Sequence, residues 1–308
     1  MIKVGITGCD DLRAAELIRV LINHPDVDLK WVTASCPPET RLDSIVHGIV
    51  GESDLIANHI GGVDDVDVIF ACGRDDLSHL TSQNMSGSVS VIDLTGAHNL
   101  DHGGGKPWTY GMSEMQRRVL VHDATHVTVP GCAAVASLLA VMPMARNLLL
   151  NNPLTLRVAV GSVMYPDDVL AWTRQQRDEV ALALTLCQSS FNQPIDLSVT
   201  QLAERRSLAV AARFKCGVDE EMIRQLYEQY YADHNFVFLV DRPVVTADVE
   251  NTNKCLIRLD KDERSGMLTV HAVMDALLKG CVGNAVHSMN LMFGLHERVG
   301  LALKASGC

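Results

Sequence analysis

One cysteine of this chain stands in a setting that favours nucleophilic chemistry. Cys132 follows Pro130 and Gly131 and precedes an apolar run with helical spacing, 133–150, so its sulfur is predicted at the N-terminus of a helix. The partial positive charge there lowers the pKa of a thiol, and the adjacent N–H groups can hold an oxyanion after attack on an acyl carbon. The alternative is an inert core cysteine, because apolar surroundings raise a thiol pKa instead.

A second candidate site is the glycine turn after the first apolar run. Gly5 and Gly8 stand at the end of a β-branched segment, and the spacing of an amphipathic helix begins at Leu12. Glycines at such a turn let backbone N–H groups approach a pyrophosphate. Asp11 occupies the place of a third glycine, and with Asp10 it puts negative charge beside a pyrophosphate. An ordinary βα turn that binds no nucleotide is therefore the alternative.

Two further glycines, Gly280 and Gly283, precede Asn284 and the last helix pattern of the chain. They permit close backbone approach, and the Asn284 amide offers both a donor and an acceptor that suit a carboxamide. The alternative is a glycine-rich loop before a core helix. The twelve histidines show no metal-ligand spacing, so no metal site is predicted.

The elements that must position these residues alternate between strand and helix. Strands predicted at 2–6, 27–34, 66–72 and 89–94 indicate a Rossmann-type doubly wound parallel sheet, with 97–107 as an exposed loop. An α+β domain follows. Its predicted strands are 156–161, 208–214, 236–240, 254–259 and 267–273, and its predicted helices are 167–186 and 219–231. The fold class is therefore α/β, with domains at 1–132 and 133–283 and a C-terminal helix, 284–308, that packs back on the first domain.

Composition fits this organisation and excludes some partners. A chain of 308 residues with 47% hydrophobic and 20% charged residues is long enough for two globular domains. The net charge of -11 argues against nucleic acid, which clustered Lys and Arg bind. There is no signal-peptide pattern and no apolar run of about 18 residues, so a cytoplasmic protein without a membrane span is predicted. Nine cysteines without a C-x-x-C pair are expected to be free thiols.

Together these segments resemble the N-acetyl-γ-glutamyl-phosphate reductases, the arginine-biosynthesis members of the semialdehyde dehydrogenases. The similarity runs nearly end to end. It is strongest at 14–25, 110–114, 130–132, 226–231, 251–255 and 279–295, the last of which includes the sequence MNLMFG at 289–294.

The resemblance implies NADPH-dependent reduction of N-acetyl-γ-glutamyl phosphate, or a related N-acyl-glutamyl phosphate, to the semialdehyde through a Cys132 thioester. It also implies a small-molecule acyl-phosphate substrate and a homodimer or homotetramer formed through the sheet of the catalytic domain. The cofactor contacts it implies are Gly5, Thr7, Gly8, Cys9, Ser35, Gly280, Gly283 and Asn284. The substrate contacts it implies are Gly161, Ser162, Asn192 and Arg206.

The chain departs from the family pattern at several of these places. The glycine turn lacks its third glycine, the arginine expected after Asp93 is missing, and Asn192 aligns with the family's acid-base histidine. Loss of a general acid or base costs typically about 10²- to 10⁴-fold in rate. Two hypotheses follow: a working reductase in which another group replaces the histidine, or a catalytically impaired paralogue that keeps fold and interface as a binding or regulatory protein.

Overall fold

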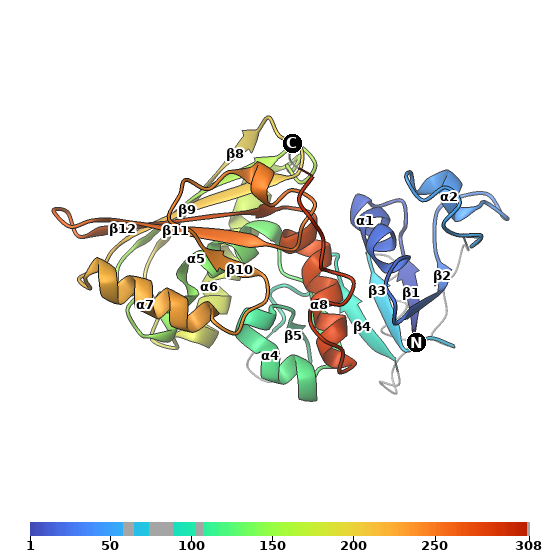
Figure 1. Cartoon of the computed structure of the whole chain (residues 1–308), viewed down its shortest axis with the longest axis horizontal. Coiled ribbons are helices and arrows are strands. Elements are labelled where there is room, and N and C mark those ends of the chain that lie inside the picture. The colour runs from blue at the N-terminus through green and yellow to red at the C-terminus, as the bar shows by residue number, and fades with distance from the viewer. Residues whose placement is uncertain (58–64, 74–88, 103–106, 307–308) are drawn as a thin grey trace. The chain divides into compact units, whose positions relative to one another are not determined.

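The computed structural model describes residues 1–57, 65–73, 89–102 and 107–306, so residues 103–106 of the predicted loop at 97–107 lie outside the described residues (Figure 1). The chain divides into two compact units. Unit 1 comprises residues 1–130 and 281–302, and unit 2 comprises residues 131–280 and 303–308. Among the described residues, no helix is both long and apolar enough to cross a membrane.

Unit 1 is built on a six-stranded sheet in the order β2-β1-β3-β4-β6-β5. Every strand pair in it is parallel, which confirms the Rossmann-type sheet that the sequence predicts. Its central strands are continuous apolar runs, as expected where a parallel sheet is buried on both faces. The strands are β1 (Ile2–Thr7), β2 (Val27–Val32), β3 (Val68–Ala71), β4 (Ser90–Asp93), β5 (Thr109–Tyr110) and β6 (His126–Thr128).

The described helices of unit 1 are α1 (Leu12–Leu21), the short α2 (Leu42–Ile45), α4 (Ser113–His122) and α8 (Gly283–Met292). The predicted helix over 284–308 is wrong in length. Gly294 adopts a φ of 69° and its N–H donates to the Leu291 carbonyl at 3.1 Å, so the chain turns out of the helix there. Residues 303–308 belong to unit 2 rather than to the first domain.

Unit 2 contains a mixed six-stranded sheet in the order β10-β11-β12-β9-β7-β8. Its strands are β7 (Leu154–Gly161), β8 (Ile195–Leu202), β9 (Ser207–Lys215), β10 (Val237–Leu239), β11 (Cys255–Asp262) and β12 (Met267–Asp275). The sequence analysis missed β8, an edge strand that pairs in parallel with β7. Its alternation is weak because most of its side chains are half-buried or exposed.

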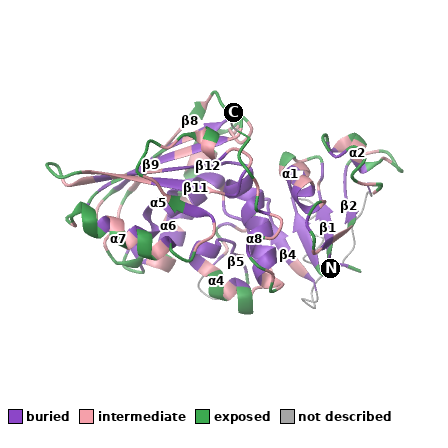
Figure 2. Ribbon diagram, viewed as in Figure 1, coloured by how far each residue is buried: buried purple, intermediate pink, exposed green. Residues whose placement is uncertain are grey.

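Three helices pack on this sheet: α5 (Cys132–Arg146), α6 (Val169–Cys187) and α7 (Glu220–Tyr231) (Figures 1 and 2). The helix α5 is apolar on all sides and contacts both the sheet, at β9 and β12, and the other two helices. It ends earlier than the predicted 133–150 because Leu148 turns the chain with a φ of 59°. The hydroxyls of Tyr227 and Tyr231, both on α7, donate to the carbonyls of Ala140 and Leu139 at 2.5 Å.

Candidate active site

Cys132 is the first residue of α5, at the helix start that the sequence predicts. The preceding Gly131 has an extended backbone and supplies no side chain to cap the helix. The Cys132 side chain is buried, with 3% exposure. The thiol therefore lies where the partial positive charge of α5 is greatest, inside the protein rather than at an open surface.

Two side chains of α6 cap the N-terminus of α5 in place of a local residue. Glu179 Oε1 accepts the Gly131 N–H at 2.9 Å, and Gln176 Oε1 accepts the Ala134 N–H at 3.0 Å. Gln176 Nε2 also donates to Glu179 Oε2 at 3.4 Å, and both side chains are buried. A Cβ added at position 131 would lie 2.1 Å from Gln176 Nε2, so any larger residue there would displace the side chain that caps the helix.

Gly280 lies against Cys132 within unit 2. A Cβ added at Gly280 would stand 2.9 Å from the Cβ of Cys132 and 3.4 Å from the Asp275 carbonyl oxygen. The prediction of a loop at 280–283 was wrong. Residues 278–282 form a π-helical turn, η2 (Leu278–Val282), which continues directly into α8. Such turns are frequent at functional sites. This one brings a glycine backbone against the thiol-bearing residue.

Asp275, at the end of β12, anchors this turn. Its fully buried carboxylate accepts the Leu277 and Leu278 N–H groups at 2.9 Å and the Asn251 N–H at 2.7 Å. Arg206 completes the set by donating from Nε at 2.8 Å and from Nη2 at 3.2 Å. Arg206, a predicted substrate contact, is thus joined to the carboxylate that shapes the Gly280 turn.

The other predicted substrate residues divide between the two ends of the sheet in unit 2. Gly161 ends β7 next to the chain before Arg206, since an added Cβ would lie 2.4 Å from the Arg205 carbonyl oxygen. Ser162 follows it and is exposed. Asn192 is exposed before β8, at the end of the strand pair where Leu154 faces Ile195. The structure therefore places Asn192 a strand length away from Gly161.

Three of the predicted cofactor residues, Thr7, Gly8 and Cys9, lie where β1 ends, beside the ends of β2 and β3. Gly8 has a φ of 66°, which requires glycine, and an added Cβ would lie 2.7 Å from the Gly73 nitrogen. The Gly8 N–H donates to Thr33 Oγ1 at 3.0 Å, and the Cys9 N–H donates to the Thr33 carbonyl at 2.8 Å. Thr7 Oγ1 accepts the Cys72 N–H at 3.3 Å. The turn is thus bound to the two strands beside β1.

Gly5 and Ser35 make different contacts. A Cβ at Gly5 would lie 2.2 Å from the ring of Trp31, so this glycine gives room to an aromatic side chain of β2. The Ser35 N–H donates to Asp10 Oδ2 at 2.9 Å. Gly283 and Asn284 begin α8 and are buried in unit 1.

The aspartate at the third glycine position is paired within its own turn. Asp11 caps α1 by accepting the Arg13 N–H at 2.7 Å, and Arg13 also donates to it from Nε at 2.8 Å and Nη2 at 2.7 Å. Burial opposes ionisation of Asp11, but the hydrogen bonds and charge of Arg13 outweigh it and hold the pKa of Asp11 below its usual range. The negative charge that the sequence places here is therefore balanced by Arg13.

These features fit a dinucleotide. In the sheet of unit 1, β1 lies between β2 and β3, so the chain continues to one side of β1 and then to the other. Ligands of such sheets bind at this point, outside the carboxyl ends of the strands. Gly8 and Gly73 lie at those carboxyl ends. Because neither has a side chain, a ligand could approach the backbone there closely. The pairing of Asp11 with Arg13 removes the part of the electrostatic objection to a pyrophosphate that Asp11 raised, whereas Asp10, among the described residues, accepts only the Ser35 N–H.

Known proteins match this chain over its whole length. N-acetyl-γ-glutamyl-phosphate reductase of Phocaeicola vulgatus is 36% identical, with 99% of each chain aligned, and that of Parabacteroides distasonis is 34% identical with the same coverage. The chain belongs to this reductase family. Two family models agree: residues 3–122 match the NAD binding domain of semialdehyde dehydrogenases, and residues 191–276 match their dimerisation domain.

Solved structures of the wider semialdehyde dehydrogenase family share the fold. Aspartate semialdehyde dehydrogenase II from Vibrio cholerae, complexed with ASA, has a TM-score of 0.73 at 14% identity, covering 96% of this chain and 98% of its own. The enzyme from Candida albicans with NADP has a TM-score of 0.70 at 10% identity, covering 95% and 98%. At these identities the likeness shows the fold alone.

Two segments that resemble the family meet inside unit 1. Ser113 Oγ, at the start of α4, lies 3.0 Å from His287 Nδ1 on α8, and His287 Nε2 lies 2.7 Å from Glu297 Oε2. All three side chains are buried, and α4 packs on α8. These contacts join the two segments within the core of unit 1.

Sequence reasoning missed Gln176, Glu179 and Asp275. No local pattern marks them, since Gln176 and Glu179 lie in the polar stretch of α6 at 173–179 and Asp275 ends a strand. Among the described residues, no cluster of three or more His, Cys, Asp or Glu side chains could hold a metal ion.

Proposed function

We propose that the chain is an NADPH-dependent N-acyl-γ-glutamyl-phosphate reductase that acts on the N-acetyl substrate, as the names of its relatives indicate. Unit 2 supplies the nucleophile and unit 1 binds the cofactor. The observation that carries the proposal is Cys132 on the first turn of α5, in a chain that aligns with these reductases from end to end. The alternative of an impaired paralogue gains no support from the comparisons.

Cys132 performs the first half of the reaction. Its sulfur attacks the acyl carbon of the acyl phosphate as the thiolate, after its proton has passed to solvent; a C–S bond forms, the C–O bond to phosphate breaks, phosphate leaves and a thioester remains. Glu179 and Gln176 accept the Gly131 and Ala134 N–H groups, so the N–H of Ala133 on the same turn would stabilise the oxygen on which negative charge develops. The Gly280 turn, held by Asp275, keeps the space beside the Cys132 Cβ free of a side chain. Gly161 and Ser162 are proposed substrate contacts at this end of the sheet.

The cofactor is held by backbone rather than by a charged side chain. Gly8, Cys9 and the N-terminal turn of α1 would take the pyrophosphate, and Ser35 at the end of β2 would lie near the ribose. When bound, the nicotinamide supplies the hydride that reduces the thioester to the semialdehyde. Trp31 packs over Gly5, next to this turn, and gives the site a fluorescent reporter.

The proposal is tested with the wild-type protein in the reverse direction. We expect N-acetylglutamate semialdehyde and NADP⁺ to give NADPH only when phosphate is present, because phosphate is the nucleophile that releases the thioester. Titration with NADPH should change the fluorescence of the three tryptophans, of which Trp31 lies beside the glycine turn, and titration with NADH compares the two cofactors. A protein that binds neither dinucleotide and gives no phosphate-dependent NADPH would contradict the reductase.

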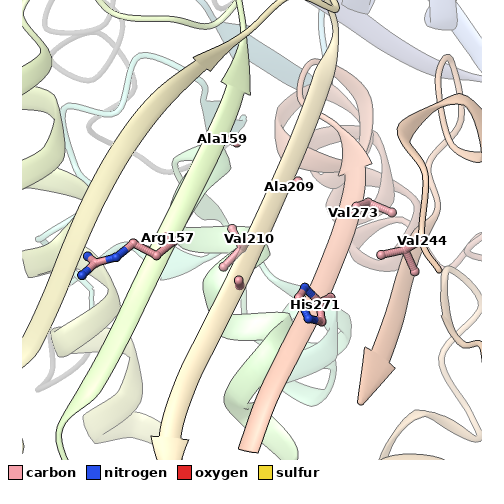
Figure 3. A pocket seen from close by; sticks show the side chains of 8 residues that line it. Arg157, Ala159, Ala209, Val210, Val244, His271 and Val273 are labelled. Carbon is pink, nitrogen blue, oxygen red and sulfur yellow. The ribbon is translucent and has the colours of Figure 1, made fainter. Parts of the chain in front are cut away.

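We further propose that the chain forms a homodimer through the open face of the sheet in unit 2. The three helices cover one face, whereas the other carries a shallow hollow of about 240 Å³ (Figure 3). Small and apolar residues form its centre, and charged or polar ones stand at its sides. The lining residues include Arg157, Ala159, Ala209, Ala211, His271 and Val273. The match of residues 191–276 to a dimerisation domain supports this surface as the interface.

Ala211 provides the test of the interface. It lies on β9 among the central lining residues and is half-buried, so Ala211→Glu is tolerated in a monomer but places a charge inside a dimer. We expect wild type to sediment as a dimer or larger oligomer and A211E to sediment as a monomer. Met222→Glu on α7, which changes an exposed apolar residue away from the sheet, is the control. An A211E oligomer identical to wild type would place the interface elsewhere.

A further inference from the structure

A buried carboxylate at the N-terminus of α5 has no role in the steps described so far. Glu179 is fully buried, and its Oε1 lies 2.9 Å from the nitrogen of Gly131, the residue directly before Cys132. Gln176 holds Glu179 Oε2 from one side and binds the Ala134 N–H from the other. The two side chains of α6 therefore enclose the first turn of α5 that carries the sulfur.

The position of this carboxylate has an electrostatic consequence. A helix N-terminus carries about half a positive charge, which stabilises one nearby anion. Both oxygens of Glu179 accept hydrogen bonds, Oε1 from the Gly131 N–H and Oε2 from Gln176 Nε2, which is the pattern of an ionised carboxylate, so we assign its negative charge to that end of α5. A thiolate at Cys132 would be a second negative charge at the same end, and like charges in a buried site oppose each other.

Other charged groups lie at this end of unit 2, but none of those described below makes the contact to the start of α5 that Glu179 makes. Asp275 and Arg206 bind each other, so their charges are largely balanced. Lys279 is buried in the η2 turn, with its Nζ 5.8 Å from the centre of the Phe236 ring. Glu204 and Arg205 are exposed next to Gly161. Of these groups, Glu179 alone accepts a hydrogen bond from the peptide that leads into Cys132.

We propose that Glu179 is a positioning residue that sets the protonation of Cys132: with Gln176 it fixes the first turn of α5, and its negative charge keeps the thiol protonated at neutral pH. The inference rests on the proposed function only in naming Cys132 as the nucleophile. A thiol held in this way gives an enzyme whose rate rises toward alkaline pH, since the thiolate is the reactive form.

The test is the pH profile of alkylation of Cys132 by iodoacetamide, which requires no turnover. Trypsin releases residues 119–146 with Cys132 as the only cysteine, so mass spectrometry reads this thiol separately. Glu179→Gln keeps a carbonyl oxygen for the Gly131 N–H and removes only the charge. We expect the midpoint of the E179Q profile to move about one pH unit lower, which is about tenfold faster alkylation at neutral pH.

Asp178→Asn is the matched control, because it removes the same charge from the exposed neighbour on α6. Cys187, half-exposed on the same helix, is an internal control thiol. An E179Q profile that coincides with wild type, or a D178N shift of equal size, overturns the proposal. If E179Q does not fold, wild type still tests the proposal: a Cys132 midpoint at or below the value of about 8.5 for a free cysteine overturns the inference.

The alkylation profile tests the role of Glu179 and the enzyme assay tests the proposed function, so each proposal can be contradicted without the other. A shifted E179Q profile in a protein without reductase activity would support the role of Glu179 and contradict the proposed function. An active reductase in which E179Q changes neither the pH profile of the rate nor the alkylation profile would support the proposed function and contradict the role of Glu179.

Discussion

Cys132→Ser is expected to lower the rate of phosphate-dependent semialdehyde oxidation by about 10³-fold or more, while NADPH binding stays unchanged. A serine hydroxyl fits the buried site at the start of α5, so the packing around it is preserved. It is almost entirely protonated at neutral pH, however, and the oxygen ester it would form is no substitute for the thioester. The measurement is the initial rate of NADPH formation, with bound NADPH followed by fluorescence.

Other cysteines serve as controls for this result. Burial raises the pKa of Cys281 to about 12, and burial together with Asp10 and Cys36 raises the pKa of Cys9 to about 12. These thiols are therefore protonated at any pH used for the assay. Cys187→Ser, which changes a half-exposed thiol of α6, should leave the rate within about twofold of wild type. Equal rates for C132S and wild type would show that the reaction does not pass through this sulfur.

Asp275→Ala is expected to lower the free energy of unfolding by about 3–5 kcal/mol, because it leaves the charge of Arg206 without its buried partner. The same change removes the hydrogen-bond acceptor of three backbone N–H groups, those of Asn251, Leu277 and Leu278. The loss should appear in urea unfolding as a lower midpoint with an unchanged slope. Because Asp275 also shapes the turn that carries Gly280, activity should fall even where the variant is folded.

Asp248→Ala is the matched control for this prediction. Asp248 bonds to Arg242 at 2.6 Å, but the Arg242 side chain is 57% exposed. Surface pairs of this kind contribute about 0–1 kcal/mol, so D248A should unfold close to wild type. An Asp275→Ala variant as stable as D248A would contradict the anchoring role of the Asp275 carboxylate.

The parts of this protein that the sequence predicted depend on local patterns. The glycine at position 8 is needed for a φ of 66°, and Pro130-Gly131 before an apolar run marks the start of α5, so the turn and the helix start were both placed correctly. The parallel sheet of unit 1 followed from short buried strands alternating with helices. Strand β8 was missed because an edge strand buries too little to show a clear alternation.

The neighbours of Cys132 were decided by tertiary structure. Glu179 follows Gly131 by 48 positions along the chain, and only the packing of α6 on α5 brings its carboxylate to the Gly131 N–H. Asn192, which alignment had suggested for the acid-base position, lies at the far end of the β7–β8 pair because the register fixes it there. The sequence by itself determined most of the strands and helices and the thiol at a helix start, since these depend on neighbours in the chain. The carboxylates around that thiol depend on contacts between distant segments, which only the folded chain specifies.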